Sequence, residues 1–253
     1  MHLDALEDKT GDQGKKFRDG EAGKTYMMSD SFPVRFISWE ESARLARTLA
    51  AHIKGDRSKL PDLVIAIGRG GFVPARVVCD ELLTTSLTSI RLEHWGPGAR
   101  RKERAVVRFP LSCSVADCDL LVIDDVSDTG DTLSVAISYL QELQPSRIRT
   151  GVLHHKASSR LNPDYYAELV KDWNWIIYPW ALHEDICGFM EIELTSHPVS
   201  LPDLHSILLK RYNLHVATDE MVSAVEDLIP LGKVTKKGEL LFAYEDGITT
   251  SES

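Results

Sequence analysis

The sequence predicts an α/β protein built on a parallel, twisted sheet with helices on both faces, followed by a small C-terminal α+β extension. Three observations lead to this fold class. The apolar runs "DLVIAIG" and "LLVID" are continuous, as in strands that are buried on both faces. Segments with helical periodicity alternate with such runs, which is typical of βα units and favours parallel pairing. Beyond residue 197 the order changes to two helices and a hairpin, which predicts a separate element.

The composition is that of a globular protein, with 43% hydrophobic and 26% charged residues among 253. The formal net charge of −9 disfavours nucleic-acid binding, because that class gains affinity from Lys and Arg side chains that neutralise phosphates. No apolar run approaches the roughly 18 residues of a membrane span, and the N-terminus lacks a signal-peptide core. The four cysteines form no CxxC pair, so reduced thiols are expected. We therefore expect a cytoplasmic protein that binds neither nucleic acid nor membrane.

Residues 1–31 are expected to be a disordered tail, since their few apolar side chains cannot offset the entropy of ordering. The main domain is expected over residues 32–196. Its first helix starts at Ser38, which forms a capping-box pattern with Glu41, and runs to about Lys54.

The middle of the chain continues the alternation of strands and helices. The strand "DLVIAIG" leads into a helix over residues 72–83, with Pro74 in its first turn. A strand over 85–93 and a mobile basic loop over 94–104 come next. The strands "LLVID" and "RIRTGVLHH" are separated by a helix over 132–144. Ligands of such sheets bind at the carboxyl ends of the strands.

The extension, residues 197–253, contains three expected elements. "LPDLHSILLKRYN" and "TDEMVSAVEDLI" are helical, the second with Thr218 as its N-cap. "GKVTKKGELLFAY" predicts a hairpin that turns at Lys237 and Gly238.

Two adjacent acids, Asp124 and Asp125, come at the carboxyl end of the run "LLVID". Ionised carboxylates left there without partners would cost several kcal/mol. Ribose hydroxyls, a divalent cation or a nearby arginine could each compensate their charge.

The turn after these acids, residues 128–132, leads into the next helix. The first amides of a helix have no internal partners and carry the positive end of the dipole, so this turn can hold a phosphate. Gly130 permits a close backbone approach, and Thr129 and Thr132 add hydroxyl donors. Asp131 is expected to point outward and to favour the helix N-terminus.

Two further strand ends carry polar groups. The loop after "DLVIAIG" can present amides and one guanidinium to an anion, and consists of Gly68, Arg69, Gly70 and Gly71. Lys156 follows the strand "RIRTGVLHH" and offers an ammonium donor. His154 and His155 beside it point to opposite faces of the strand, so they are a poor metal chelate.

"VIDDVSDTGDT" resembles the phosphoribosyl-diphosphate (PRPP) binding motif of the type I phosphoribosyltransferases. "IAIGRGGFVPA" is similar to the pyrophosphate loop of that family, "HHK" to its base-recognition strand and "WIIYPW" to the segment that covers the purine. The four segments occur in the family's order, and the resemblance extends from about Phe36 to Trp180. Within the family it points to the xanthine-guanine phosphoribosyltransferases.

The resemblance implies a Rossmann-like fold and the transfer of ribose 5-phosphate from PRPP to a purine nitrogen, with Mg²⁺ as cofactor and pyrophosphate as product. It implies that Asp124 and Asp125 hold the ribose hydroxyls and the metal, and that Asp128 is the general acid or base at N7 of the purine. The 5′-phosphate would bind Asp128, Thr129, Gly130, Asp131 and Thr132. It also implies a homo-oligomer, a dimer or tetramer.

For the other substrate groups the resemblance implies two more sets of residues. Those for pyrophosphate are Gly68, Arg69, Gly70, Gly71 and, from a flexible flap, Arg100 and Arg101. A cis peptide is expected between Gly68 and Arg69. For the base, Lys156 would donate to the 6-oxo group, Trp175 would stack on the ring and Ile176 would offer its carbonyl. Trp173 and Trp180 are expected to be core or interface residues.

The sequence departs from the pattern of these relatives at two positions. Ile177 and Ala181 stand where acids are common, which opens the choice of purine. His183, Glu184 and Asp185 follow closely and could supply a polar substitute or be surface charges.

Two alternatives stay open. One is a phosphoribosyltransferase for another base, such as adenine, orotate or uracil. The other is a nucleotide-sensing regulator in which residues 201–246 form a DNA-binding winged helix. Charge opposes the regulator, since five basic and eight acidic side chains give this segment a net charge of −3.

Overall fold

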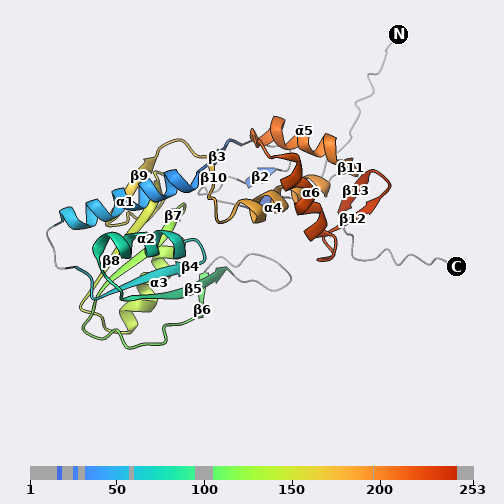
Figure 1. Ribbon diagram of the computed structural model, residues 1–253. Coiled ribbons are helices and arrows are strands. Elements are labelled where there is room, and N and C mark those ends of the chain that lie inside the picture. The colour runs from blue at the N-terminus through green and yellow to red at the C-terminus, as the bar shows by residue number, and fades with distance from the viewer. Residues whose placement is uncertain are drawn as a thin grey trace, which may run out of the picture.

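The computed structural model describes residues 16–18, 25–27, 32–56, 60–94, 105–195 and 197–243 (Figure 1). A six-stranded sheet forms the centre of the larger part of the molecule. Its strands, in spatial order, are β6 (Ala105–Phe109), β5 (Leu87–His94), β4 (Leu63–Gly68), β7 (Asp119–Ser127), β8 (Arg147–Lys156) and β9 (Tyr165–Val170). All neighbours pair in parallel except β6, which is antiparallel to β5. The predicted α/β fold class is confirmed.

Helices cover both faces of this sheet, which explains the continuous apolar runs. Val64 and Ala66 of β4 pack in one cluster with helices α1 (Trp39–Gly55) and α2 (Phe72–Leu82). Ile65 and Ile67 pack on the other face, against α3 (Asp131–Glu142). Alternate residues of one strand therefore enter different cores, and both sets must be apolar.

The predicted cap of α1 is confirmed, because the Glu41 N–H donates to Ser38 Oγ at 3.0 Å. The strand predicted over "LLVID" is longer than expected. Its pairing with β4 ends at Ile123, but its pairing with β8 continues to Ser127. Asp124 and Asp125, the sixth and seventh of the nine residues of β7, therefore lie within the strand instead of at its end.

The C-terminal extension has its own core. In the structure the extension also includes helix α4 (Leu182–Leu194), whose residues fall in the expected main domain. Its other elements are β11 (Val199–Ser200), α5 (Leu201–Tyr212), α6 (Thr218–Leu228), β12 (Val234–Lys237) and β13 (Leu240–Ala243). Phe189 of α4, Leu204 of α5 and Met221 of α6 share one buried cluster. Because Ile177 and α4 pack there, the second core includes residues that precede residue 197. A short parallel pair, β3 (Val34–Phe36) and β10 (Trp175–Ile177), joins the two parts (Figure 1).

The extension has the order helix, strand, helix, helix, strand, strand, and its first strand pairs with its last, in the sheet β11-β13-β12. This is the arrangement of a winged helix. The predicted hairpin is confirmed with its turn one residue later, at Gly238 and Glu239. The predicted N-cap Thr218 is wrong: Ala217 is the cap, and its N–H donates to Glu220 Oε2 at 3.1 Å.

Two other predictions concern the termini and loops. Within the expected tail 1–31, the structure describes two paired antiparallel strands, β1 (Lys16–Arg18) and β2 (Thr25–Met27), so these six residues differ from the expectation. The other residues of the tail lie outside the described part of the chain, and so do Arg100 and Arg101 of the basic loop. None of the described helices is long and apolar enough to cross a membrane.

Candidate functional site

The carboxyl ends of β4, β7 and β8 lie side by side in the sheet, and each carries residues of the predicted site. The loop after β4 contains Gly68 and Arg69, joined by the expected cis peptide bond. A Cβ on Gly70 would lie 2.2 Å from Asp125 Oδ2, and one on Gly71 would lie 2.3 Å from the Ile123 carbonyl. The loop backbone thus rests directly on β7, and only glycine permits this approach.

The Arg69 side chain leaves this loop and pairs with Glu184 at the start of α4. Its Nη2 lies 2.6 and 2.5 Å from the two Glu184 carboxylate oxygens. Both side chains are about two-thirds exposed, at 64% and 65%. Such a solvent-screened pair contributes little to stability, so the guanidinium can exchange Glu184 for an anionic ligand.

Asp124 is buried and Asp125 is half-buried, and neither has a cationic partner in the described part of the chain. Burial raises the pKa of Asp124 well above its usual value, and the neighbouring charge of Asp125 adds to this effect. Burial also raises the pKa of Asp125 to about 6. The Asp125 N–H donates to Asp124 Oδ1 at 2.9 Å. The charged forms of two such carboxyl groups would be stabilised by a bound cation or by hydroxyl groups that donate hydrogen bonds to them.

The acid pair fits a divalent cation only in part. Carboxylate oxygens are the protein ligands that Mg²⁺ prefers. Among the described residues, however, no group of three His, Cys, Asp or Glu side chains could hold a metal. Asp124 and Asp125 would therefore bind Mg²⁺ together with oxygens from a substrate. This is common for Mg²⁺, which usually keeps several water ligands and binds only one or two protein carboxylates.

The predicted phosphate turn leads into the start of α3. Gly130, with φ of 85°, is the cap residue of this helix and has no side chain that could cap it, but the Asp131 N–H donates to Thr129 Oγ1 at 3.3 Å. A Cβ on Gly130 would lie 2.8 Å from both Ser159 Oγ and Leu161 Cβ, so the turn packs closely on the loop after β8. The Arg160 N–H donates to the Thr129 carbonyl at 3.0 Å and holds the two loops together. Apart from the Asp131 amide, the helix start is thus available to an anion.

Asp128 and Lys156 come from different strands and meet in the structure. Lys156 Nζ lies 3.0 Å from Asp128 Oδ1, and the lysine side chain is 5% exposed. Burial lowers the pKa of Lys156, an effect that Asp128 opposes. The ammonium also lies 4.7 Å above the Trp173 ring. Trp173, expected in the core or an interface, therefore contacts a predicted site residue.

Two of the three residues predicted to contact the base lie on β10. Trp175 donates its Nε1–H to Asp185 Oδ1 at 3.2 Å, and its ring meets Phe189 of α4 edge-on. Ile176 pairs with Arg35 of β3. The structure brings neither into a described contact with Lys156, so their roles toward a base stay predictions. Burial raises the pKa of Asp185 to about 6.

The sequence analysis missed the contribution of Tyr178 and expected Trp180 only as a core or interface residue; Trp180 does pack against the core cluster of α1 and α2, but it also contacts the site. Trp180 donates its Nε1–H to Asp125 Oδ2 at 3.4 Å, and its ring stacks on Tyr178. The available signal was the segment "YPW" itself, since Tyr and Trp in a buried strand end usually carry a hydrogen bond.

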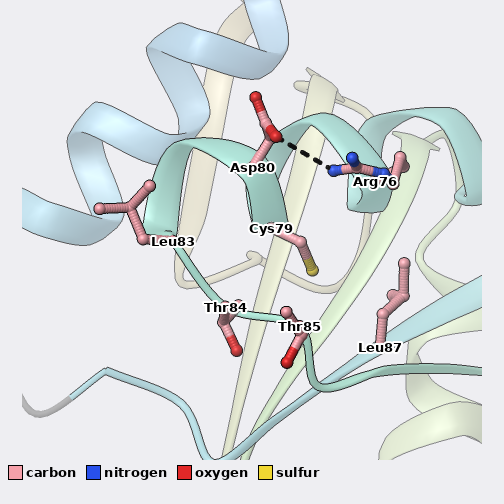
Figure 2. A pocket seen from close by; sticks show the side chains of 7 residues that line it. All are labelled: Arg76, Cys79, Asp80, Leu83, Thr84, Thr85 and Leu87. Carbon is pink, nitrogen blue, oxygen red and sulfur yellow. Dashed lines mark hydrogen bonds and ion pairs between the residues drawn. The ribbon is translucent and has the colours of Figure 1, made fainter.

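A surface pocket of about 480 Å³ lies elsewhere (Figure 2). Arg76, Cys79 and Asp80 line it from α2, and the segment after this helix provides the rest of its lining. That segment leads into β5, so the pocket is at the amino ends of the strands. It contains none of the predicted site residues.

Comparison with known proteins agrees with this arrangement. Residues 36–185 match the family model described as a phosphoribosyl transferase domain. Xanthine-guanine phosphoribosyltransferase from Idiomarina loihiensis is 30% identical over 152 residues, 58% of this chain and 87% of that protein. The Cereibacter sphaeroides protein of the same name is 30% identical over 154 residues, 58% and 86%. The crystal structure of a purine phosphoribosyltransferase from Pyrococcus horikoshii is 28% identical, with a TM-score of 0.52 over 58% of this chain and 93% of that one.

Proposed function

The chain belongs to the phosphoribosyl transferase domain family, and we propose that it transfers ribose 5-phosphate from PRPP to a 6-oxopurine base: guanine, xanthine or hypoxanthine. Pyrophosphate is the second product, and the reaction would serve purine salvage. The names of the similar proteins from Idiomarina and Pyrococcus support a purine as acceptor. We also propose a cytoplasmic homo-oligomer.

One observation carries the choice of base: the 3.0 Å pair between Lys156 and Asp128. The ammonium of Lys156 only donates hydrogen bonds, so it suits the 6-oxo group of a purine and cannot accept one from the 6-amino group of adenine. The carboxylate of Asp128 only accepts, so it suits an N7–H. Together the two groups present a donor and an acceptor to adjacent positions of one ring edge.

The rest of the site suits the departing group. Bond cleavage leaves a sugar with oxocarbenium character and a diphosphate with growing negative charge. Amides of residues 68–71, with Arg69, would stabilise the diphosphate, and Arg100 and Arg101 would add to this from outside the described residues. Bound Mg²⁺ would neutralise part of the same charge. Asp124 and Asp125 would hold the ribose hydroxyls and the metal.

Asp128 would move the proton in the reaction. It accepts the N7 proton of the purine as the new bond to the sugar forms, and returns it in the reverse direction. Its ion pair with Lys156 would keep the carboxylate in place before the base arrives.

The deciding experiment is a turnover assay of guanine, xanthine, hypoxanthine and adenine with PRPP and Mg²⁺. We expect at least one 6-oxopurine to react and adenine to be inert. Lys156→Met keeps the length of the side chain but not the donor, and should lose activity with every 6-oxopurine. Preferential turnover of adenine, orotate or uracil would contradict the proposal.

A second candidate function has one observation in its favour. The winged-helix order of α4 to β13 suits a nucleotide-responsive regulator on the same fold. The exposed face of α6 argues against it, because Asp219, Glu226 and Asp227 would face the DNA phosphates. Fluorescence anisotropy with duplex DNA at about 50 and 200 mM salt separates the two candidates. Salt-dependent binding without turnover would favour the regulator.

A further inference from the structure

We propose that Tyr178, Trp180 and His154 form a clamp that fixes Asp125 in place, so that they act as positioning residues for the transfer reaction. This inference rests on the proposed function, since it assigns Asp125 to the ribose and metal.

Asp125 receives two hydrogen bonds from one short segment. The Tyr178 hydroxyl donates to the Asp125 carbonyl at 2.9 Å, and the Trp180 Nε1–H donates to Asp125 Oδ2 at 3.4 Å. The Tyr178 and Trp180 rings stack in parallel, with centroids 4.8 Å apart and planes 7° apart. Pro179 lies between them and restricts the backbone. Main chain and side chain of the acid are thus held by one rigid unit.

The carbonyl of Asp125 needs such a donor. The pairing of β7 with β4 ends at Ile123, two residues earlier. A buried carbonyl beyond the end of a strand pair costs free energy unless another group donates to it. Tyr178, 3% exposed, supplies that donor from β10 and its following turn. The clamp therefore supplies a donor to β7 beyond the point where its pairing with β4 ends, while its pairing with β8 continues.

The positions of the protons in the clamp follow from its acceptors. A carbonyl oxygen can only accept, so the single hydroxyl proton of Tyr178 points to Asp125. His154 Nδ1 lies 2.7 Å from the same hydroxyl oxygen and must donate to it. His154 is consequently the Nδ1–H tautomer, and burial, which lowers its pKa to about 4, keeps it neutral. The hydrogen bonds therefore run in one direction, from His154 to Tyr178 and from Tyr178 to the Asp125 carbonyl.

Asp125 is also contacted by the loop of residues 68–71, which is proposed to bind pyrophosphate. The backbone of Gly70 lies so close that a Cβ there would overlap the Asp125 carboxylate. Gly70 and Trp180 both approach Asp125 Oδ2, so together they restrict the rotation of the carboxylate. Acids that must meet ribose hydroxyls or a metal gain from this, because misplacement by about 1 Å can cost about 100-fold in rate.

The test compares two buried tyrosines that can lose the same hydroxyl. Tyr178→Phe keeps the ring that stacks on Trp180. Tyr212→Phe is the matched control, since Tyr212 is 2% exposed and its hydroxyl bonds to Glu193 in the extension. We expect both to lower the unfolding temperature, but only Tyr178→Phe to lower kcat, by about 10-fold. The KM for the purine should be unchanged.

Variants of His154 sharpen the test. His154→Leu removes the donor to Tyr178, whereas His154→Asn retains an amide donor at a similar position. We expect His154→Leu to lower kcat about as much as Tyr178→Phe, and His154→Asn to restore part of it. Wild-type kcat in Tyr178→Phe, or an equal loss in Tyr212→Phe, would overturn the clamp.

A binding measurement separates this inference from the proposed function. Calorimetric titration with PRPP and Mg²⁺ needs no turnover, and we expect about 10-fold weaker binding in Tyr178→Phe and wild-type binding in Tyr212→Phe. If no purine reacts with the wild-type protein, the proposed function fails. In that case, weaker PRPP binding in Tyr178→Phe than in Tyr212→Phe still supports the clamp, and equal affinities of the two variants overturn it.

Discussion

The sheet domain and the C-terminal extension bury charged groups in different ways. In the described part of the extension, Glu193 is the one buried charged residue, and it bonds to Arg211 and Tyr212. The sheet domain has a comparable pair, Asp119 with Arg149, at 2.9 Å. At the carboxyl ends of its strands, however, the domain also buries Asp124, without a described cationic partner.

The comparison distinguishes buried charges that are paired within the protein from buried charges that are not. A buried charge without a partner destabilises the fold, and a well-packed apolar residue would serve stability better. The pairs in the extension and at Asp119 are satisfied and need no ligand to explain them. The acids on β7 have no such partner among the described residues, and we propose that a ligand compensates their charge. Perturbed pKa values like theirs often occur at functional sites.

The largest effect is expected at Asp128. Asp128→Ala should lower turnover about 1000-fold, because general acid-base catalysis contributes factors of this order. PRPP binding should be largely retained, as measured by calorimetry. Asp227→Ala is the control, an exposed acid of the extension 2.9 Å from His183, and should leave turnover unchanged. Unaltered turnover in Asp128→Ala would defeat the assignment of the base.

Two glycines, one in the sheet domain and one in the extension, differ in the space around them and so allow a matched test. Gly70→Ala places a Cβ 2.2 Å from Asp125 Oδ2, so we expect the loop or the acid to shift and turnover to fall about 100-fold. Gly188 of α4 has open space around it, so Gly188→Ala should stabilise the protein by about 0.5 to 1 kcal/mol with unchanged turnover. Equal kinetics in both variants would show that the contact at Gly70 is unimportant.

The core of the extension is expected to affect stability alone. Leu204 is fully buried, and Leu204→Ala should lower the free energy of unfolding by about 2.5 kcal/mol. Urea denaturation measures this, and kcat per folded molecule should match the wild type. A fall in kcat would instead mean that the extension shapes the active site, through the contacts of α4 with Trp175 and Arg69.

The smallest effect concerns Asp185, where the two regions meet. Its pKa in the folded protein is about 6, above the usual 3.8, so folding favours its protonated form. Stability from this group is present below the unfolded pKa and is lost as the pH rises through 6. Asp185→Asn cannot titrate and keeps an acceptor for Trp175. Its stability relative to the wild type should therefore increase between pH 4.5 and 7.5 in urea denaturation, and a constant difference would contradict this.

Much of the fold could be predicted because its signals are local. Continuous apolar runs identified the buried strands, and the glycines and caps identified the turns between them. Errors lie at boundaries that depend on neighbours: β7 extends to Ser127 because β8 still pairs with it there. The cap of α6 moved from Thr218 to Ala217 because Glu220 reaches back to that amide.

The sequence by itself determined the sheet, the glycine-containing turns proposed to bind anions and the strand that carries the acids, because periodicity and turn chemistry act between near neighbours. Only the tertiary structure decided which of these groups meet. Lys156 pairs with Asp128 across 28 positions, and Tyr178 reaches Asp125 across 53. Such contacts depend on how strands are ordered in the sheet and where each one ends, and no local pattern encodes that distance in space.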